Sequence, residues 1–157
     1  MNKNRPLCNI VVLDLTNVLS GPFATQILSD LGAEIIKVEK PNGDDSRKFG
    51  PFIKKRSSYF ISLNRGKKSI VVDFNNKEDK KIFKKLLAIS DVIIDNFKPG
   101  TLEKYGFSSN YLKKKFPSLI QTKISGFGET GPLKENPAYD MIVQAMGGIM
   151  SITGKNK

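Results

Sequence analysis

The chain has 157 residues and a formal net charge of +11, with 26 Lys and Arg against 15 Asp and Glu. It contains one Cys and no His, which excludes an internal disulfide, Ser-His and Cys-His catalytic pairs and most zinc sites. Acid–base chemistry would therefore rest on carboxylates, lysine or tyrosine. The length corresponds to about one domain.

No run of about 18 apolar residues is present, and the polar N-terminus leads into a short apolar run that contains Asp14. We therefore expect a cytoplasmic protein with neither a membrane span nor a signal peptide. Lysine runs such as 113–115 are typical of solvated helix faces, although affinity for a polyanion is the alternative. Because no nucleic-acid-binding motif is found, a phosphate-rich cofactor is the better candidate.

The first 39 residues are typical of a β-α-β unit. The β-branched run 10–15 (IVVLDL) predicts a buried strand, and 16–21 (TNVLSG) is rich in cap and turn residues. Pro22 suits the first turn of a helix, in which apolar residues recur at helical spacing up to Leu31. A second strand is expected at 33–39 (AEIIKVE), parallel to the first.

Residues 41–68 break this rhythm. The segment holds Pro41-Asn42-Gly43, five basic residues between Arg47 and Arg56, and scattered aromatics. A long excursion without clear periodicity is usually functional or disordered, and the aromatics favour partial order. A basic turn at 64–68 precedes the next strand.

The rest of the chain alternates again. Strands are expected at 69–74, 91–95 and 119–124. Between them, Asn75 and Glu78 resemble a capping box before a helix, and short helices are expected at 101–105 and from Ser108 or Ser109 to Phe116. After the last strand come a glycine-rich loop, a helix entry at 137–140 and an apolar helix at 141–150 that contains Gly147-Gly148.

This near-strict alternation predicts an α/β fold, a Rossmann-like doubly wound and mostly parallel sheet. Ligands of such sheets gather at the carboxyl ends of the strands. The corresponding segments are 16–21, Lys40, 73–75, 96–100 and 125–128. No Walker motif supports an ATP site.

Several of these segments carry a family resemblance. In order and spacing, the chain resembles the N-terminal part of the class III CoA-transferases, a group that includes formyl-CoA transferase, carnitine CoA-transferase and the α-methylacyl-CoA racemases. The matching pieces are VLDLTNVLSGPFATQILSDLGAEIIKVEKP, NRGKKSIVVDF, DVIIDNFKPGTLEKYGF, SGFGETGP and PAYDMIVQAMGGIMSITG. The resemblance implies that residues 1–157 form a CoA-binding α/β portion of the large domain, without the C-terminal remainder of the family fold.

The resemblance also implies a set of contacts with coenzyme A or acyl-CoA, and no metal. Carried over by position, these contacts fall at Val18, Leu19, Ser20, Lys40, Val72, Asp73, Phe74, Asn75, Asn96, Phe97, Lys98, Lys104, Tyr139 and Asp140. Family transferases often have arginine at positions 40 and 104. Lysine keeps the charge there but loses the bidentate fork.

Transferases of this family move CoA between an acyl-CoA and a carboxylic acid through a covalent aspartyl intermediate. The resemblance places that aspartate beyond Lys157, so the chain alone is expected to be inactive, and the full-length family forms interlocked homodimers. Asp140 is a weak substitute, more simply explained as a carboxylate at a helix entry. A racemase-like member is one alternative, although Tyr139 stands where racemases have histidine. A non-catalytic CoA-binding remnant and a basic nucleic-acid binder are the others.

Overall fold

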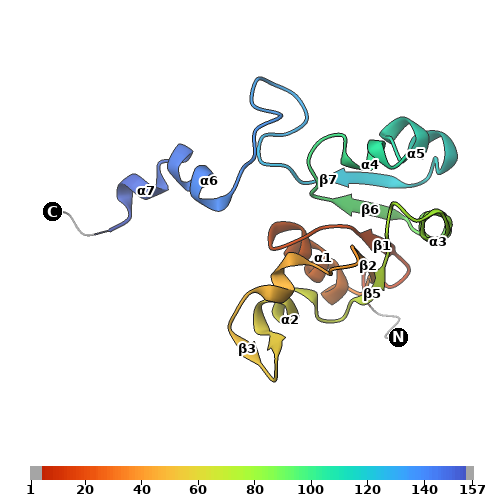
Figure 1. Cartoon of the computed structure of the whole chain (residues 1–157), viewed down its shortest axis with the longest axis horizontal. Coiled ribbons are helices and arrows are strands. Elements are labelled where there is room, and N and C mark those ends of the chain that lie inside the picture. Colours follow the sequence, from red (N-terminus) through yellow and green to blue (C-terminus); the bar gives the residue numbers. More distant parts are fainter. Residues whose placement is uncertain (1–4, 155–157) are drawn as a thin grey trace. The chain divides into compact units, whose positions relative to one another are not determined.

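The structure is a computed structural model that describes residues 5–154. Its first unit extends to Ile124 and is built on a five-stranded sheet (Figure 1). The strands of this sheet are β1 (Val11–Asp14), β2 (Glu34–Glu39), β5 (Lys68–Val71), β6 (Val92–Asp95) and β7 (Ile120–Lys123). The helices of the unit are α1 (Ser20–Asp30), α2 (Ser58–Asn64), α3 (Lys77–Ala88), α4 (Thr101–Lys104) and α5 (Ser109–Lys115).

The sheet is entirely parallel, with the strand order β5-β2-β1-β6-β7. Leu13 of β1 lies opposite Ile36 of β2 on one side and Ile93 of β6 on the other. The chain first moves outward from β1 to β5 and then returns to β6 beside β1. The sequence-based prediction of a doubly wound parallel sheet is therefore confirmed, and the order of the strands reverses between β1 and β6.

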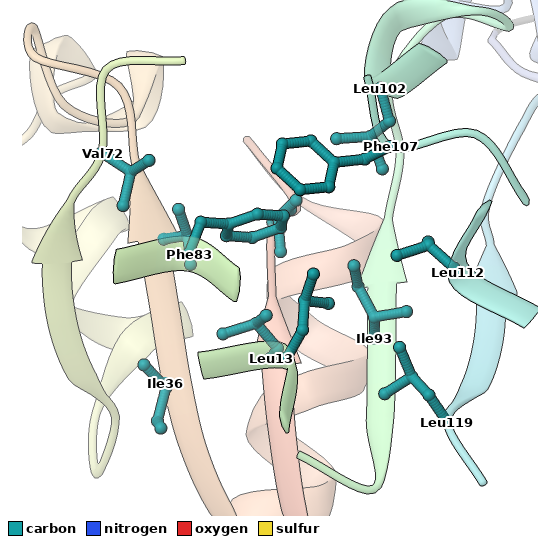
Figure 2. Packing of buried hydrophobic residues seen from close by; sticks show 12 residues of the cluster. Leu13, Ile36, Val72, Phe83, Ile93, Leu102, Phe107, Leu112 and Leu119 are labelled. Atoms are coloured by element: carbon teal, nitrogen blue, oxygen red, sulfur yellow. The ribbon is translucent and has the colours of Figure 1, made fainter. Parts of the chain in front are cut away.

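One face of the sheet carries the larger hydrophobic core. Because side chains alternate along a strand, Leu13, Ile36 and Ile93 share this face with residues of α3, α4 and α5. Figure 2 shows Phe83 of α3 beside Phe107, above the strands. Their ring centroids are 4.8 Å apart in an edge-to-face arrangement, a geometry that adds to the stabilisation from buried area.

The other face changes character along the strands. Val12 and Ile35 form a small apolar cluster near the start of their strands. Two residues further on, in the same alternation, stand Asp14 and Lys37, both essentially fully buried. Buried charges therefore replace apolar packing at the carboxyl ends of β1 and β2.

Helix α1 forms as predicted, but the face that carries the apolar repeat of Phe23 and Ile27 is not the face that is buried. The side chains of Phe23 and Ile27 are 52% and 46% exposed, whereas Thr25 and Gln26 are buried. The buried threonine follows from the charges on this face, because its hydroxyl donates to Asp14 Oδ2 at 2.7 Å.

The segment 41–68 is ordered into short elements. The sequence did not predict them, because the segment shows no clear periodicity. It contains a 3-10 helix η1 (Asp45–Lys48), a two-stranded antiparallel hairpin of β3 (Phe52–Ile53) and β4 (Arg56–Ser57), and helix α2. Ser57 connects them, since its hydroxyl donates to Ser46 O at 2.9 Å and accepts from the N–H of Phe60. Helix α2 packs against α1 and η1.

Two details of the expected helix ends need correction. The N-cap of α3 is Asn76, not Asn75, because its side chain accepts from the N–H groups of Glu78 and Asp79. The expected helix 141–150 is interrupted at Gly148, whose φ of 76° ends one helix and begins another. The resulting helices are α6 (Asp140–Met146) and α7 (Ile149–Ile152).

Residues from Ser125 onward form a second compact unit. Close packing within it occurs at Gly126, where a Cβ atom would lie 1.8 Å from that of Ala138. Large apolar side chains on its helices, such as Met141 and Ile152, are mostly exposed to solvent. Among the described residues of both units, no helix has the length and hydropathy needed to cross a membrane.

Candidate functional site

A buried ion pair fixes the loop that follows β1. Lys37 Nζ lies 2.9 Å from Asp44 Oδ2, and the two side chains are 1% and 0% exposed. The same ammonium group donates to Thr16 O at 2.7 Å. Burial alone would raise the pKa of Asp44, but the hydrogen bonds from Ser46 and the charge of Lys37 lower it. Asp44 therefore stays ionised, and its partner ties the turn after β2 to the loop after β1.

A second buried pair holds the opposite end of the same loop. Lys67 Nζ is 3.1 Å from Asp14 Oδ2, with both side chains essentially inaccessible. It also donates to Pro22 O at 2.9 Å, to Thr25 Oγ1 at 2.8 Å and to Asn64 Oδ1 at 2.9 Å. Burial lowers the pKa of Lys67, and the neighbouring Asp14 carboxylate opposes that shift.

Between these anchors the loop adopts a constrained backbone. Val18 has a φ of 71°, an unusual value for a β-branched residue, and its N–H donates to Asp44 Oδ1 at 3.3 Å. Asn17 and Asn96 form two hydrogen bonds of 2.9 Å with each other. The backbone N–H of Asn17 donates to Asn96 Oδ1, and the side-chain amide of Asn96 donates to Asn17 O. The loop after β1 is thereby joined to the loop after β6, at the point where the strand order reverses.

Close packing also fixes the start of α1. A Cβ atom on Gly21 would lie 2.3 Å from the Cβ of Thr16, so this position requires glycine for space. Among the described residues, no side chain caps α1, whose N-cap is Leu19. A helix N-terminus without a side-chain cap is electrostatically suited to an anion or a carbonyl oxygen.

Glu39, the last residue of β2, stands two positions after Lys37 in the same alternation, and we call the three buried residues Asp14, Lys37 and Glu39 the charged layer. Its carboxylate accepts two hydrogen bonds of 2.7 Å from Arg47 and one of 2.9 Å from the N–H of Asp44. Burial would raise the pKa of Glu39, but these bonds, together with one from Ser69, lower it to about 2. The guanidinium of Arg47 in turn lies 3.8 Å over the ring of Phe60, which anchors α2.

A cleft of about 170 Å³ opens beside this layer, at the carboxyl ends of four adjacent strands. Asn17 follows β1, Lys40 follows β2, Phe74 follows β5 and Phe97 follows β6. The remaining lining residues are Leu15, Val38, Glu39, Val72, Thr101 and Tyr105. The walls are thus mainly apolar and aromatic, with a lysine and a few polar groups, which is the usual composition of a small-molecule site.

The structure brings four of the expected site residues together in this cleft, namely Lys40, Val72, Phe74 and Phe97. The other expected residues of the first unit, which do not line the cleft, are Val18, Leu19, Ser20, Asp73, Asn75, Asn96, Lys98 and Lys104. Tyr139 and Asp140 belong to the second unit, where Tyr139 is 70% exposed and Asp140 begins α6. Asp140 accepts from the side-chain amide of Gln144 in the next turn.

Sequence reasoning missed Leu15, Val38 and Glu39, which lie at or just after the ends of β1 and β2, and two further cleft residues that lie within or just after α4. Thr101 and Tyr105 return to the cleft because the chain turns at Gly100, which has a φ of 77°. The ring of Tyr105 stacks on Phe74 at 5.1 Å between centroids. The glycine between two polar segments was the available signal for such a turn.

Comparison with known proteins defines the class to which this chain belongs. The model of CoA-transferase family III matches residues 7–157, and the chain belongs to this family. It is 50% identical to acetyl-CoA:oxalate CoA-transferase of Acetobacter aceti over 150 residues, which is 95% of this chain and 39% of that relative. It is 46% identical to human succinyl-CoA:glutarate CoA-transferase, covering 98% of this chain and 36% of that protein.

A solved structure agrees with these matches. The crystal structure of a CaiB/BaiF family protein from Brucella suis superposes with a TM-score of 0.91 at 46% identity. The alignment covers 98% of this chain and 42% of that one. The chain therefore spans about two fifths of the length of the relatives it matches.

Lys37 within β2 and Lys40 just after it give a matched test of the buried pair. Replacing Lys37 with Met leaves the Asp44 carboxylate buried without its cation, and we expect a loss of about 3–5 kcal/mol in the free energy of unfolding. Lys40→Met is the control, because Lys40 pairs with Asp45 at half-exposed positions and an exposed pair contributes about 1 kcal/mol or less. Denaturant unfolding measures both, and equal losses would contradict the account.

The lowered pKa of Glu39 predicts a pH dependence of stability. The folded-state pKa is about 2 against an ordinary value of 4.5, so the stabilisation is fully present above the ordinary value and is lost as the pH falls toward 2. Glu39→Gln should therefore be less stable at neutral pH and should lose less stability on acidification. Denaturant unfolding at several pH values checks this, with the exposed Glu78→Gln as control. An unchanged acid slope in Glu39→Gln would refute the prediction.

Proposed function

We propose that this chain is the CoA-binding part of a class III CoA-transferase, which moves CoA between an acyl-CoA and a carboxylic acid. One observation carries the proposal: the loops after four parallel strands converge on a single cleft at the strand-order reversal. Family membership supplies the ligand class, since relatives at 42–50% identity bear the names of CoA-transferases acting on succinyl-CoA or acetyl-CoA.

The chemistry of the cleft suits the nucleotide end of coenzyme A. Phe74, Phe97 and Tyr105 offer apolar and aromatic surface for a purine ring, and Asn17 and Thr101 offer polar groups for its edge or for the ribose. Lys40, at the rim, supplies a point charge for a phosphate. The uncapped N-terminus of α1, beside the constrained loop after β1, favours a developing or full negative charge at the thioester end.

The reaction proposed for the whole protein is covalent catalysis by a carboxylate. An aspartate attacks the acyl-CoA carbonyl, which gives a mixed anhydride and frees the CoA thiolate. The thiolate attacks the aspartyl carbonyl, which forms an enzyme thioester and releases the donor acid. The acceptor acid then attacks this thioester, which gives a new aspartyl anhydride and frees the CoA thiolate again, and the thiolate attacks the acceptor carbonyl to form the new acyl-CoA and regenerate the aspartate. We propose that the aspartate lies beyond position 157, so that residues 1–157 bind CoA without turnover.

Titration with CoA by calorimetry tests the binding proposal. We expect saturable binding at one site per chain, and roughly tenfold weaker binding in Lys40→Met if one charge-assisted phosphate contact is lost. Lys81→Met is a matched control, because Lys81 lies on the exposed side of α3 and pairs with Glu78. Absence of saturable binding, or salt-sensitive binding to random DNA alone, would overturn the proposal.

A further inference from the structure

Lys40 already has an anionic partner inside the protein. Its ammonium group lies 2.7 Å from Asp45 Oδ1, and the two side chains are 50% and 52% exposed. The pair is one of three that cross the β2–η1 turn. The other two, Lys37 with Asp44 and Arg47 with Glu39, each involve at least one buried carboxylate. Among these three, the pair at the cleft rim is the one open to solvent on both sides.

This exposure makes the Lys40–Asp45 pair easy to exchange. An exposed ion pair contributes little to stability, and a ligand with higher charge density can displace the carboxylate. The Asp45 backbone, however, is held by hydrogen bonds that its neighbour makes within the protein. It is preceded by the buried Asp44, whose N–H donates to Glu39 and whose carboxylate accepts from the N–H of Ser46. Asp45 therefore remains within reach of Lys40.

We propose that Asp45 acts through Lys40 as a positioning residue that tunes the affinity of the cleft for phosphate. In the free protein it occupies the ammonium group, and a phosphate-bearing ligand must displace it. Asp45 thus weakens the binding of anions at this rim. The inference rests on the proposed function, because it requires a phosphate of the ligand to reach Lys40.

A double-mutant cycle with CoA as the probe tests the inference. We expect Asp45→Asn to bind CoA roughly two- to fivefold more tightly, which corresponds to the strength of one exposed ion pair. The gain in affinity should vanish when Asp45→Asn is made in the Lys40→Met background, because Asp45 and the phosphate then have no ammonium group to compete for. Calorimetric titration of the wild type, both single variants and the double variant completes the cycle.

The control separates local competition from a general change of charge. Glu78→Gln also removes one negative charge from an exposed lysine pair, but on α3 away from the cleft lining, so CoA affinity should not change. A gain in Glu78→Gln equal to that in Asp45→Asn, or a gain that persists without Lys40, overturns the inference and leaves the proposed function standing. A wild-type chain that does not bind CoA overturns both.

Discussion

The burial of two lysine–carboxylate pairs under the loop after β1 is the constraint on which the rest of the site depends. Removing such charges from water costs several kcal/mol per ion, and the cost is offset only if the ions are paired and hydrogen-bonded. Lys37 pairs with Asp44 and donates to Thr16 O in the loop, and Lys67 pairs with Asp14 and donates to Pro22 O in the first turn of α1. The pairs therefore specify one loop conformation, including the left-handed backbone of Val18, rather than simply adding stability.

This arrangement explains how a single sheet can hold its loops in one conformation and still present an exchangeable ion pair at the cleft rim. The larger aromatic core lies on one face, and the charged layer lies at the carboxyl ends of β1 and β2 on the other. Moving outward from this layer, the ion pairs change from fully buried to half exposed at Lys40 and Asp45. The buried pairs hold the backbone in place, and the exposed pair remains free to exchange its partner for a ligand.

The sequence was sufficient to predict the strands and helices of the parallel sheet, because strand and helix periodicities are local properties. It also indicated Lys40, Phe74 and Phe97, since the carboxyl ends of parallel strands meet at one edge, and the family resemblance added Val72. It could not show that Lys37, in the middle of an apolar strand, pairs with Asp44, because this contact depends on the path of the turn after β2. The order of 41–68 was concealed for a similar reason: η1, the hairpin and α2 are too short to show a period and are held by tertiary bonds such as those of Ser57.

Amide hydrogen exchange in the ligand-free chain tests most directly whether the buried pairs fix this loop before any ligand binds. The N–H groups of Thr16 and Asn17 donate to Asp14 and Asn96, each at 2.9 Å. The account predicts that they exchange as slowly as those of the central strand β1, and that Lys37→Met accelerates their exchange much more than Lys40→Met does. Fast exchange at Thr16 and Asn17 in the wild type, with slow exchange retained in β1, would contradict the claim, because the loop would then be ordered by its ligand rather than by the buried charges.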